Sequence, residues 1–109
     1  MIHEIISGIY ISNMNTSLDH IIYKKYNITI VLNISTTIPF VDFNIKKIRL
    51  PFNNIQILKN NLNNILLFIY EHFIEYNILI CCDENYHLLI IALFLIKYGN
   101  IQHYNIKHI

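Results

Sequence analysis

The sequence is poor in charged residues, above all in arginine. Charged side chains make up 14% of its 109 residues, against about 25% in an average protein. Of the eight basic residues only one, Arg49, is an arginine. Arginine is the side chain that favours bidentate recognition of phosphate, and basic patches drive non-specific nucleic-acid binding. The composition therefore excludes an electrostatic nucleic-acid binder and disfavours a phosphate-binding protein.

Cysteine, proline and glycine occur only twice each, and tryptophan is absent. The two cysteines, Cys81 and Cys82, are adjacent and cannot cross-link distant parts of the chain, which favours a reducing compartment. The first ten residues lack the basic and apolar regions of a secretory signal peptide. The longest apolar run, Leu88 to Ile96, is too short for a membrane span of about 20 residues. We therefore expect a soluble cytoplasmic protein with no membrane partner.

Apolar side chains are abundant and make up 54% of the chain, with 26 isoleucines. This share excludes a disordered chain, since disorder goes with low hydrophobicity and high net charge. A chain of this length has room for one hydrophobic core. We therefore expect a single domain over residues 1–109.

Short runs of β-branched residues predict strands, most clearly at residues 28–32 and 77–82. Other strands are predicted at residues 5–6, 9–11 and 45–50. A helical period over residues 55–76 predicts the longest helix. Strands that alternate with helices are typical of an α/β fold with a mostly parallel central sheet and helices on both faces.

Two further helices are predicted on either side of this long one. The polar residues Asn15, Thr16 and Ser17 offer N-cap oxygens for a helix that would bury Leu18, Ile21 and Ile22. The second helix spans residues 88–98 and is apolar all round, so we expect the rest of the domain to enclose it. Gly99 and Asn100 are typical C-cap residues and should end it.

The turn after Cys82 is the predicted site, because ligands of open parallel sheets bind beyond the carboxyl ends of the strands. Residues 9–13 (IYISN), 28–35 (ITIVLNIS) and 78–82 (ILICC), followed by 93–96 (LFLI), carry a resemblance here. In order and spacing they resemble the LYLGN, ITHVLNVS, VLVHC and AYLM segments of the dual-specificity phosphatases, which belong to the cysteine-dependent protein tyrosine phosphatase superfamily. The resemblance covers roughly residues 5–99 and implies a phosphatase-like fold, shortened at its C-terminal end.

The family signature H-C-x-x-G-x-x-R-S places Cys82 on the nucleophilic cysteine and Cys81 on the preceding histidine. Asn85 takes the place of the glycine and Leu88 that of the arginine. The family's general acid, an aspartate three residues after a proline, corresponds to Asn54. The degenerate phosphate loop is Cys82, Asp83, Glu84, Asn85, Tyr86, His87 and Leu88.

These departures remove the chemistry of phosphoryl transfer. Leu88 cannot bind phosphate oxygens, and the charge stabilisation that the arginine would give is usually the largest contribution to catalysis. Asp83 and Glu84 disfavour both a thiolate and an incoming phosphate. Asn54 cannot protonate a leaving group. The sequence therefore resembles a pseudophosphatase, not an active enzyme, with weak or absent phosphate binding.

Protein binding is the function expected of such a domain. The resembled family usually has further helices after the one that follows its catalytic loop, so apolar surface should be left uncovered here. Large exposed apolar patches usually mark interfaces, so we expect a homodimer or another protein partner. Abundant Ile, Asn, Lys and Tyr are typical of AT-rich genomes, and we take a large DNA virus, with action in the host cytoplasm, as a working hypothesis.

The residues are also compatible with other functions. A weak or divergent phosphatase, or a thiol hydrolase in which His87 activates Cys82, is the main rival. Cys82 is otherwise a small buried hydrophobe. Binding of phosphorylated partners without cleavage is a third interpretation. We expect no cofactor and no metal, since the six histidines show no i,i+4 pairing. Lys46, Lys47 and Arg49 are interpreted as a solvated basic face.

Overall fold

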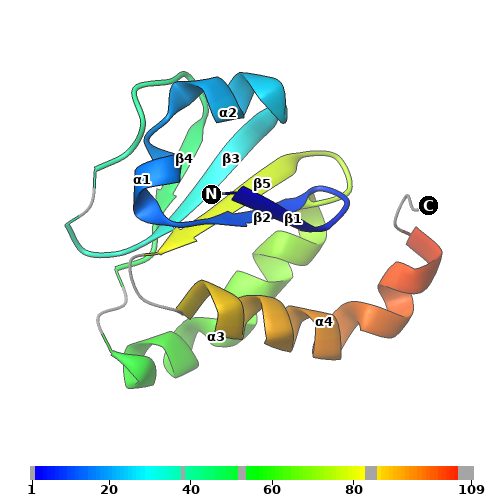
Figure 1. Cartoon of the computed structure of the whole chain (residues 1–109). Helices are drawn as coiled ribbons and strands as arrows, with labels where there is room; N and C mark the ends of the chain where they lie inside the picture. Colours follow the sequence, from blue (N-terminus) through cyan, green and yellow to red (C-terminus); the bar gives the residue numbers. More distant parts are fainter. Residues whose placement is uncertain (1, 38, 52–53, 83–85, 106–109) are drawn as a thin grey trace.

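The protein is a five-stranded sheet with helices on both faces (Figure 1). The computed structural model describes residues 2–37, 39–51, 54–82 and 86–105, with side chains as far as residue 98. The strands are β1 (Ile2–Ile6), β2 (Ile9–Ser12), β3 (Ile28–Ile34), β4 (Lys46–Arg49) and β5 (Asn77–Cys82). The helices are α1 (Met14–Ser17), α2 (His20–Lys25), α3 (Ile55–His72) and α4 (Tyr86–Asn105).

The strand order in the sheet is β1-β2-β5-β3-β4. Strands β2, β5, β3 and β4 run parallel, and only β1 is antiparallel to its neighbour. β5 therefore lies at the centre, and its residues Ile78 to Ile80 are fully buried. A strand covered on both faces needs a continuous apolar run, which β5 has. The predicted α/β class with a mostly parallel sheet is confirmed.

The hairpin that joins β1 to β2 places an antiparallel strand at one edge of the sheet. Gly8 has φ 98°, a backbone conformation that glycine adopts without steric cost, and it forms the turn with Ser7. The pairing of β1 with β2 shifts register between Glu4 and Ile6, which is a β-bulge. The hairpin thus covers the outer side of β2 with an irregular strand.

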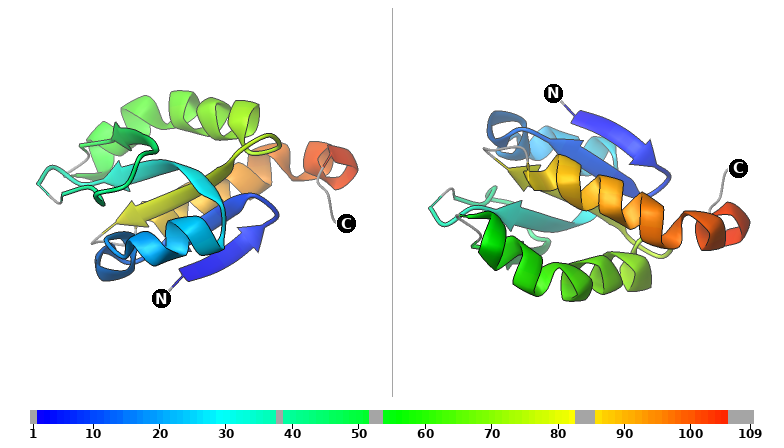
Figure 2. Two further views of the ribbon diagram at one scale, coloured as in Figure 1. Left: turned by 90° about the horizontal axis from the view of Figure 1, so that it is seen from above. Right: turned by 90° about the horizontal axis from the view of Figure 1, so that it is seen from below.

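The helices form two layers, one on each face of the sheet. Figure 2 shows α3 and α4 together beneath the sheet, with α2 on the opposite face. The core under α3 and α4 contains Phe73 and Phe94, both 0% exposed, with their rings edge to face at 5.7 Å. The core under α1 and α2 is smaller and includes Tyr23, whose hydroxyl donates to the Ser17 carbonyl at 2.7 Å.

The segment between β2 and β3 differs from its prediction, since it forms two short helices. The Asn13 side chain caps α1 by accepting from the Thr16 N–H at 2.9 Å, and Asp19 caps α2 by accepting from the Ile21 N–H at 3.0 Å. Because Asp19 supplies a second N-cap, the chain turns there instead of continuing one helix. Ile21 is 59% exposed, and of the three predicted apolar contacts (Leu18, Ile21 and Ile22) only Ile22 is buried.

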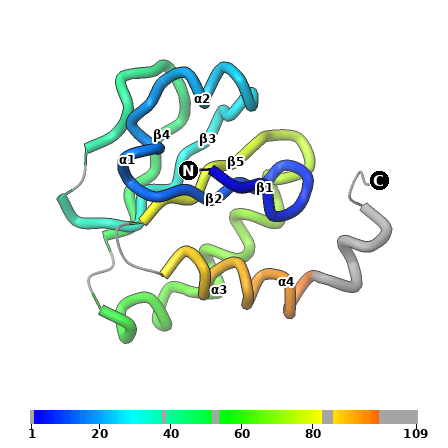
Figure 3. Tube along the Cα trace, viewed as in Figure 1, coloured from blue at the N-terminus to red at the C-terminus, as the bar shows by residue number. Residues whose placement is uncertain are grey.

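Helix α4 also differs from its prediction in two respects. It continues past Gly99 to Asn105, since a glycine inside a helix costs only about 1 kcal/mol relative to alanine and does not by itself end the helix. The domain does not enclose it either, because Leu88 is 48% exposed and Ile96 is 79% exposed. The Cα trace in Figure 3 shows why: α4 runs beside α3 and contacts the sheet from below only.

In the part of the chain that the structure describes, every helix is too short or too polar to cross a bilayer.

Candidate functional site

The two cysteines lie at the carboxyl end of the central strand and face opposite layers. Neighbouring residues of a strand point to opposite faces of the sheet. Cys82 is 3% exposed and belongs to the core under α3 and α4, whereas Cys81 is 1% exposed and belongs to the core under α1 and α2. Both thiols are therefore buried, and neither forms a disulfide.

The thiol of Cys81 has low reactivity at neutral pH. Burial raises the pKa of its thiol to about 11, and this outweighs the opposite effects of a hydrogen bond with Ser17 and of the Arg49 charge. Its Sγ donates to the Leu32 carbonyl at 3.7 Å. A thiol with this pKa is almost entirely protonated near pH 7, so it has little nucleophilic thiolate there.

The predicted phosphate loop begins at Cys82, and three of its residues, Asp83, Glu84 and Asn85, lie outside the described residues. The next three, Tyr86, His87 and Leu88, form the first turn of α4. The three side chains differ in burial: Tyr86 is half-buried, His87 is 9% exposed and Leu88 is 48% exposed. The residue at the predicted arginine position is thus apolar and solvent-facing.

A hollow of about 250 Å³ lies between this first turn and the end of β2. Its lining comes from His3, Ile11, Ser12, Asn13, His87 and Leu88. Among the described residues, the lining includes two members of the predicted loop but not Cys82. The hollow therefore brings His87 and Leu88 together with the end of β2, and leaves the buried thiol outside.

Asn54, at the predicted general-acid position, is the N-cap of α3. Its Oδ1 accepts from the Ile57 N–H at 2.9 Å, and its backbone is extended, as an N-cap requires. The side chain is exposed and turned toward its own helix. The asparagine at position 54 thus has a structural role as a helix cap, which the family resemblance did not predict.

Arg49 anchors a polar network at the same end of the sheet. Its Nη1 donates to the carbonyl oxygen and the hydroxyl of Ser35, both at 3.2 Å, and its guanidinium lies 4.9 Å from the Phe40 ring centroid. The Ser35 hydroxyl in turn donates to Asn33 Oδ1 at 2.7 Å. The interpretation of Arg49 as part of a solvated basic face is therefore wrong, although Lys46 and Lys47 are exposed.

Strand register explains why these polar groups meet. Ser12 pairs with Cys81, Cys81 with Asn33, and Asn33 with Arg49. Residues paired in this way share one face of the sheet, so the four form a row across the parallel strands. One feature of the sequence indicates this row, namely the asparagine inside the apolar strand β3. A buried polar side chain needs hydrogen-bond partners, so other polar groups are expected beside it.

The described residues contain no group of three or more His, Cys, Asp or Glu side chains placed to hold a metal ion. The adjacent cysteines do not add to such a group, since their side chains lie in different layers.

Comparison with solved structures identifies this architecture. A point-mutated form of human DUSP28 matches with a TM-score of 0.80 and 10% sequence identity, over 91% of this chain and 72% of that chain. DUSP15 matches with a TM-score of 0.79 and 15% identity, over 91% and 67% of the two chains. The chain has the dual-specificity phosphatase fold. A mouse protein described as a dual-specificity phosphatase, in complex with zinc tungstate, matches with a TM-score of 0.68 and 13% sequence identity, over 90% of this chain and 65% of that chain.

The phosphatase fold predicted from the sequence is thereby confirmed, and the chain is shorter than the solved chains that it matches. No protein-family model matches the sequence, and no curated protein sequence matches it. At 10–15% identity the likeness carries the fold alone. The function of the site depends on its own residues and not on the fold.

Proposed function

We propose that this protein is a catalytically inactive domain with the dual-specificity phosphatase fold, a pseudophosphatase, and that it acts by binding protein, foremost a second copy of itself. We place it in the cytoplasm, of an infected host if its source is viral. The proposal rests above all on Leu88. By the sequence resemblance Leu88 takes the position of the family's phosphate-binding arginine, and it is 48% exposed at one end of an apolar helix face.

The chemistry of the site supports inactivity. A thiolate phosphatase needs an accessible nucleophile, donors for the phosphate oxygens and an acid for the leaving group. Cys82 is 3% exposed, Leu88 has no donor, and the amide of Asn54 already caps α3. The loss of three separate contributions is harder to offset than the loss of one.

The exposed face of α4 supports the interface. Its apolar residues recur at i, i+4, i+7 and i+8, the spacing of one helix face. They are Leu88, Ala92, Leu95 and Ile96, and all four are exposed. Ala92 lies mid-way along this α4 face, where a small side chain lets a second helix approach closely. Two copies meeting through the same patch would form a two-fold pair, the commonest arrangement of homo-oligomers.

Activity is tested by turnover of an aryl phosphate by the purified protein and by Cys82→Ser. We expect the two rates to be equal and close to background. A Cys82-dependent rate well above background would overturn the inactive assignment. It would favour the rival, a divergent cysteine-dependent phosphatase or thiol hydrolase, for which the hollow beside His87 is the available cavity.

The alignment is tested by restoring the missing groups. A variant with Asn54→Asp, Asn85→Gly and Leu88→Arg, and with Asp83 and Glu84 replaced by their amides, should gain phosphate or vanadate binding. Binding by the unmodified protein would instead favour recognition of phosphorylated partners. A folded variant that binds neither anion would contradict the assignment of these positions.

Self-association is tested by sedimentation equilibrium. We expect the protein to dimerise at micromolar concentration and Ile96→Glu to shift it to a monomer, since Ile96 is 79% exposed on α4. The matched control is Ile21→Glu, which places the same charge at a 59% exposed isoleucine on α2. A monomer at high micromolar concentration, or equal effects of the two variants, would argue against the α4 interface.

A further inference from the structure

The outer edge of the sheet formed by β4 is a second surface with the features of a binding site. β4 is last in the strand order and pairs only with β3 among the described strands. An edge strand presents a row of backbone groups that another extended chain can pair with. The edge lies at the opposite end of the sheet from β1, and it is distinct from the α4 face discussed above.

The backbone of β4 directs alternate residues toward the open side of the sheet. The Leu50 N–H donates to the Asn33 carbonyl of β3 at 2.9 Å. The backbone groups of successive residues of a strand point alternately to its two sides, so those of Lys47 face away from β3. An added strand can therefore pair with both the N–H and the C=O of Lys47.

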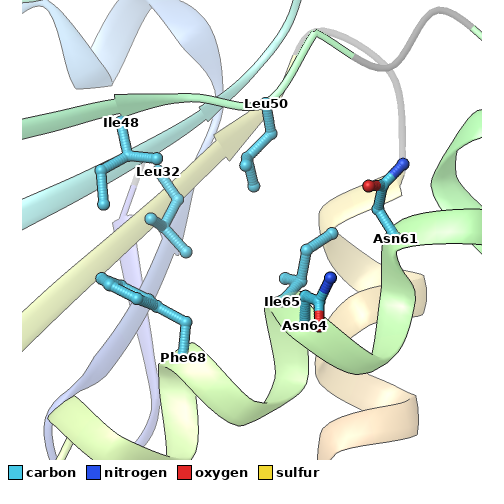
Figure 4. Close-up of a pocket in the computed structure, with 7 residues that line it drawn as sticks. All are labelled: Leu32, Ile48, Leu50, Asn61, Asn64, Ile65 and Phe68. Carbon is cyan, nitrogen blue, oxygen red and sulfur yellow. The ribbon is translucent and has the colours of Figure 1, made fainter.

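An apolar cavity opens beside this edge, between β4 and α3. It measures about 200 Å³. Its lining is Leu32, Ile48, Leu50, Asn61, Asn64, Ile65 and Phe68. Figure 4 shows the side chains of Ile48, Leu50 and Phe68 turned toward the shared space from the strand and the helix, with the two asparagine side chains on the α3 side. Ile48, Leu50 and Phe68 are only half-buried. The cavity thus offers an apolar surface to an incoming side chain.

A second, more polar hollow of about 250 Å³ lies further along the same strand and helix. Its lining is Thr29, Ile30, Lys46, His72 and Tyr76. The His72 ring stacks on Phe68 at 4.1 Å, and its Nδ1 donates to the Phe68 carbonyl at 2.7 Å. Phe68 therefore lines the apolar cavity while it fixes the ring that lines the polar hollow. The exposed ammonium of Lys46 gives this hollow a positive charge.

The two hollows have the spacing of alternate residues in a strand. Lys46 and Ile48 are two residues apart in β4, and each lines one hollow. Two residues of a strand span about 6.6 Å, so side chains i and i+2 of an added strand would lie opposite the two hollows. Strand addition gains affinity from main-chain hydrogen bonds and specificity from pockets for alternate side chains, and this groove has both.

We propose that the β4–α3 groove, formed by these two hollows and the β4 edge, binds an extended segment of a partner protein. The segment pairs with Lys47 as a sixth strand, places an apolar side chain between Ile48 and Phe68, and places a carboxylate at Lys46. Charge complementarity decides the occupant: exposed Lys46 and Lys47 favour an acidic segment and oppose a second copy of the same basic strand.

The test is fluorescence anisotropy with a labelled peptide of sequence Thr-Glu-Thr-Leu-Thr-Glu-Thr. This sequence is the same in both directions, so the result does not depend on the orientation of the added strand. Saturable binding is expected, with losses of about tenfold or more when leucine is replaced by serine or when Lys46→Glu is introduced. Lys59→Glu, the same substitution at an exposed lysine on the outer side of α3, should change affinity less than about twofold.

Charge reversal gives an independent arm. A peptide with lysine in place of both glutamates should bind Lys46→Glu better than it binds the unmodified protein, which a misfolded variant would not do. Absence of binding at millimolar peptide, or equal effects of Lys46→Glu and Lys59→Glu, would overturn the proposal. If Lys46→Glu altered dimerisation, the β4 edge would be assigned to a second copy of the chain, and this result would also overturn the proposal. The Ile96→Glu variant should bind the peptide normally, so failure of the α4 interface and failure of this groove are distinguishable.

Discussion

Replacing Arg49 by methionine should destabilise the protein substantially, although Arg49 lies on an edge strand. The guanidinium donates twice to Ser35, once to its buried carbonyl and once to its hydroxyl, at 3.2 Å each. Hydrogen bonds from charged groups contribute about 1.5–3 kcal/mol. The Phe40 ring at 4.9 Å adds about 0.5–1 kcal/mol. Because such contributions are not additive, we expect a loss of about 2–3 kcal/mol.

The assay is urea denaturation followed by circular dichroism, with thermal unfolding in parallel. A loss of this size lowers Tm by roughly 8–15 °C in a domain of this length. The matched control is Lys47→Met, which removes the same charge from an exposed neighbour in β4 and should cost less than about 0.5 kcal/mol.

A double-mutant cycle with Ser35→Ala identifies the source of the loss. Groups in one hydrogen-bond network show a coupling energy of about 0.5–3 kcal/mol, and we expect about 1 kcal/mol or more here. Additive effects of the two substitutions, or equal losses for Arg49→Met and Lys47→Met, would refute the assignment of Arg49 as the anchor of the carboxyl edge.

Four further outcomes are expected. Asn54→Ala should lower the free energy of unfolding by about 1 kcal/mol while Asn54→Asp leaves it nearly unchanged in urea titrations, because either oxygen caps α3. In a Cys82→Ala background, iodoacetamide should modify Cys81 at pH 8 only as fast as the protein unfolds, since Cys81 is 1% exposed and burial raises its thiol pKa to about 11. Burial raises the pKa of Tyr23 above its usual 10, so the contribution of Tyr23 to stability is complete below pH 10 and is lost as pH rises further. The free energy of unfolding, measured by urea denaturation from pH 8 to 11, should show this decline, and the decline should be weaker in Tyr23→Phe. Phe94→Ala should cost about 3–5 kcal/mol by calorimetry, since Phe94 is 0% exposed.

The elements predicted well are those with a strong periodic signal and a clear boundary. β5 coincides with the predicted strand at residues 77–82, and α3 begins at residue 55 as predicted, directly after the Asn54 cap. Runs of isoleucine and leucine leave little choice there, because only a central strand or the inner face of a long helix buries them. The order and direction of the strands, in contrast, depend on contacts between distant segments.

The features that sequence reasoning missed depend on such contacts or on single hydrogen bonds. The cap at Asp19 divides one predicted helix into two, and it involves one side-chain oxygen. Arg49 meets Ser35 only because β3 and β4 pair in one particular register. At the candidate site, the positions of Cys82 and Leu88 relative to strand and helix were predicted, and burial of the Cys82 thiol was one of two interpretations that the sequence left open. The capping role of Asn54 was not predicted, because it depends on one hydrogen bond.

The β-bulge between Glu4 and Ile6 limits how this protein can assemble. The sheet has two edges, and the irregular pairing at β1 makes that edge a poor template for another strand. β4 pairs regularly, so each molecule has a single edge of ordinary strand geometry. Two copies that paired through their β4 strands would leave only the two irregular β1 edges exposed. Edge pairing between copies of this chain would therefore stop at two molecules, and a filament built from such copies would require the bulge in β1 to be removed first.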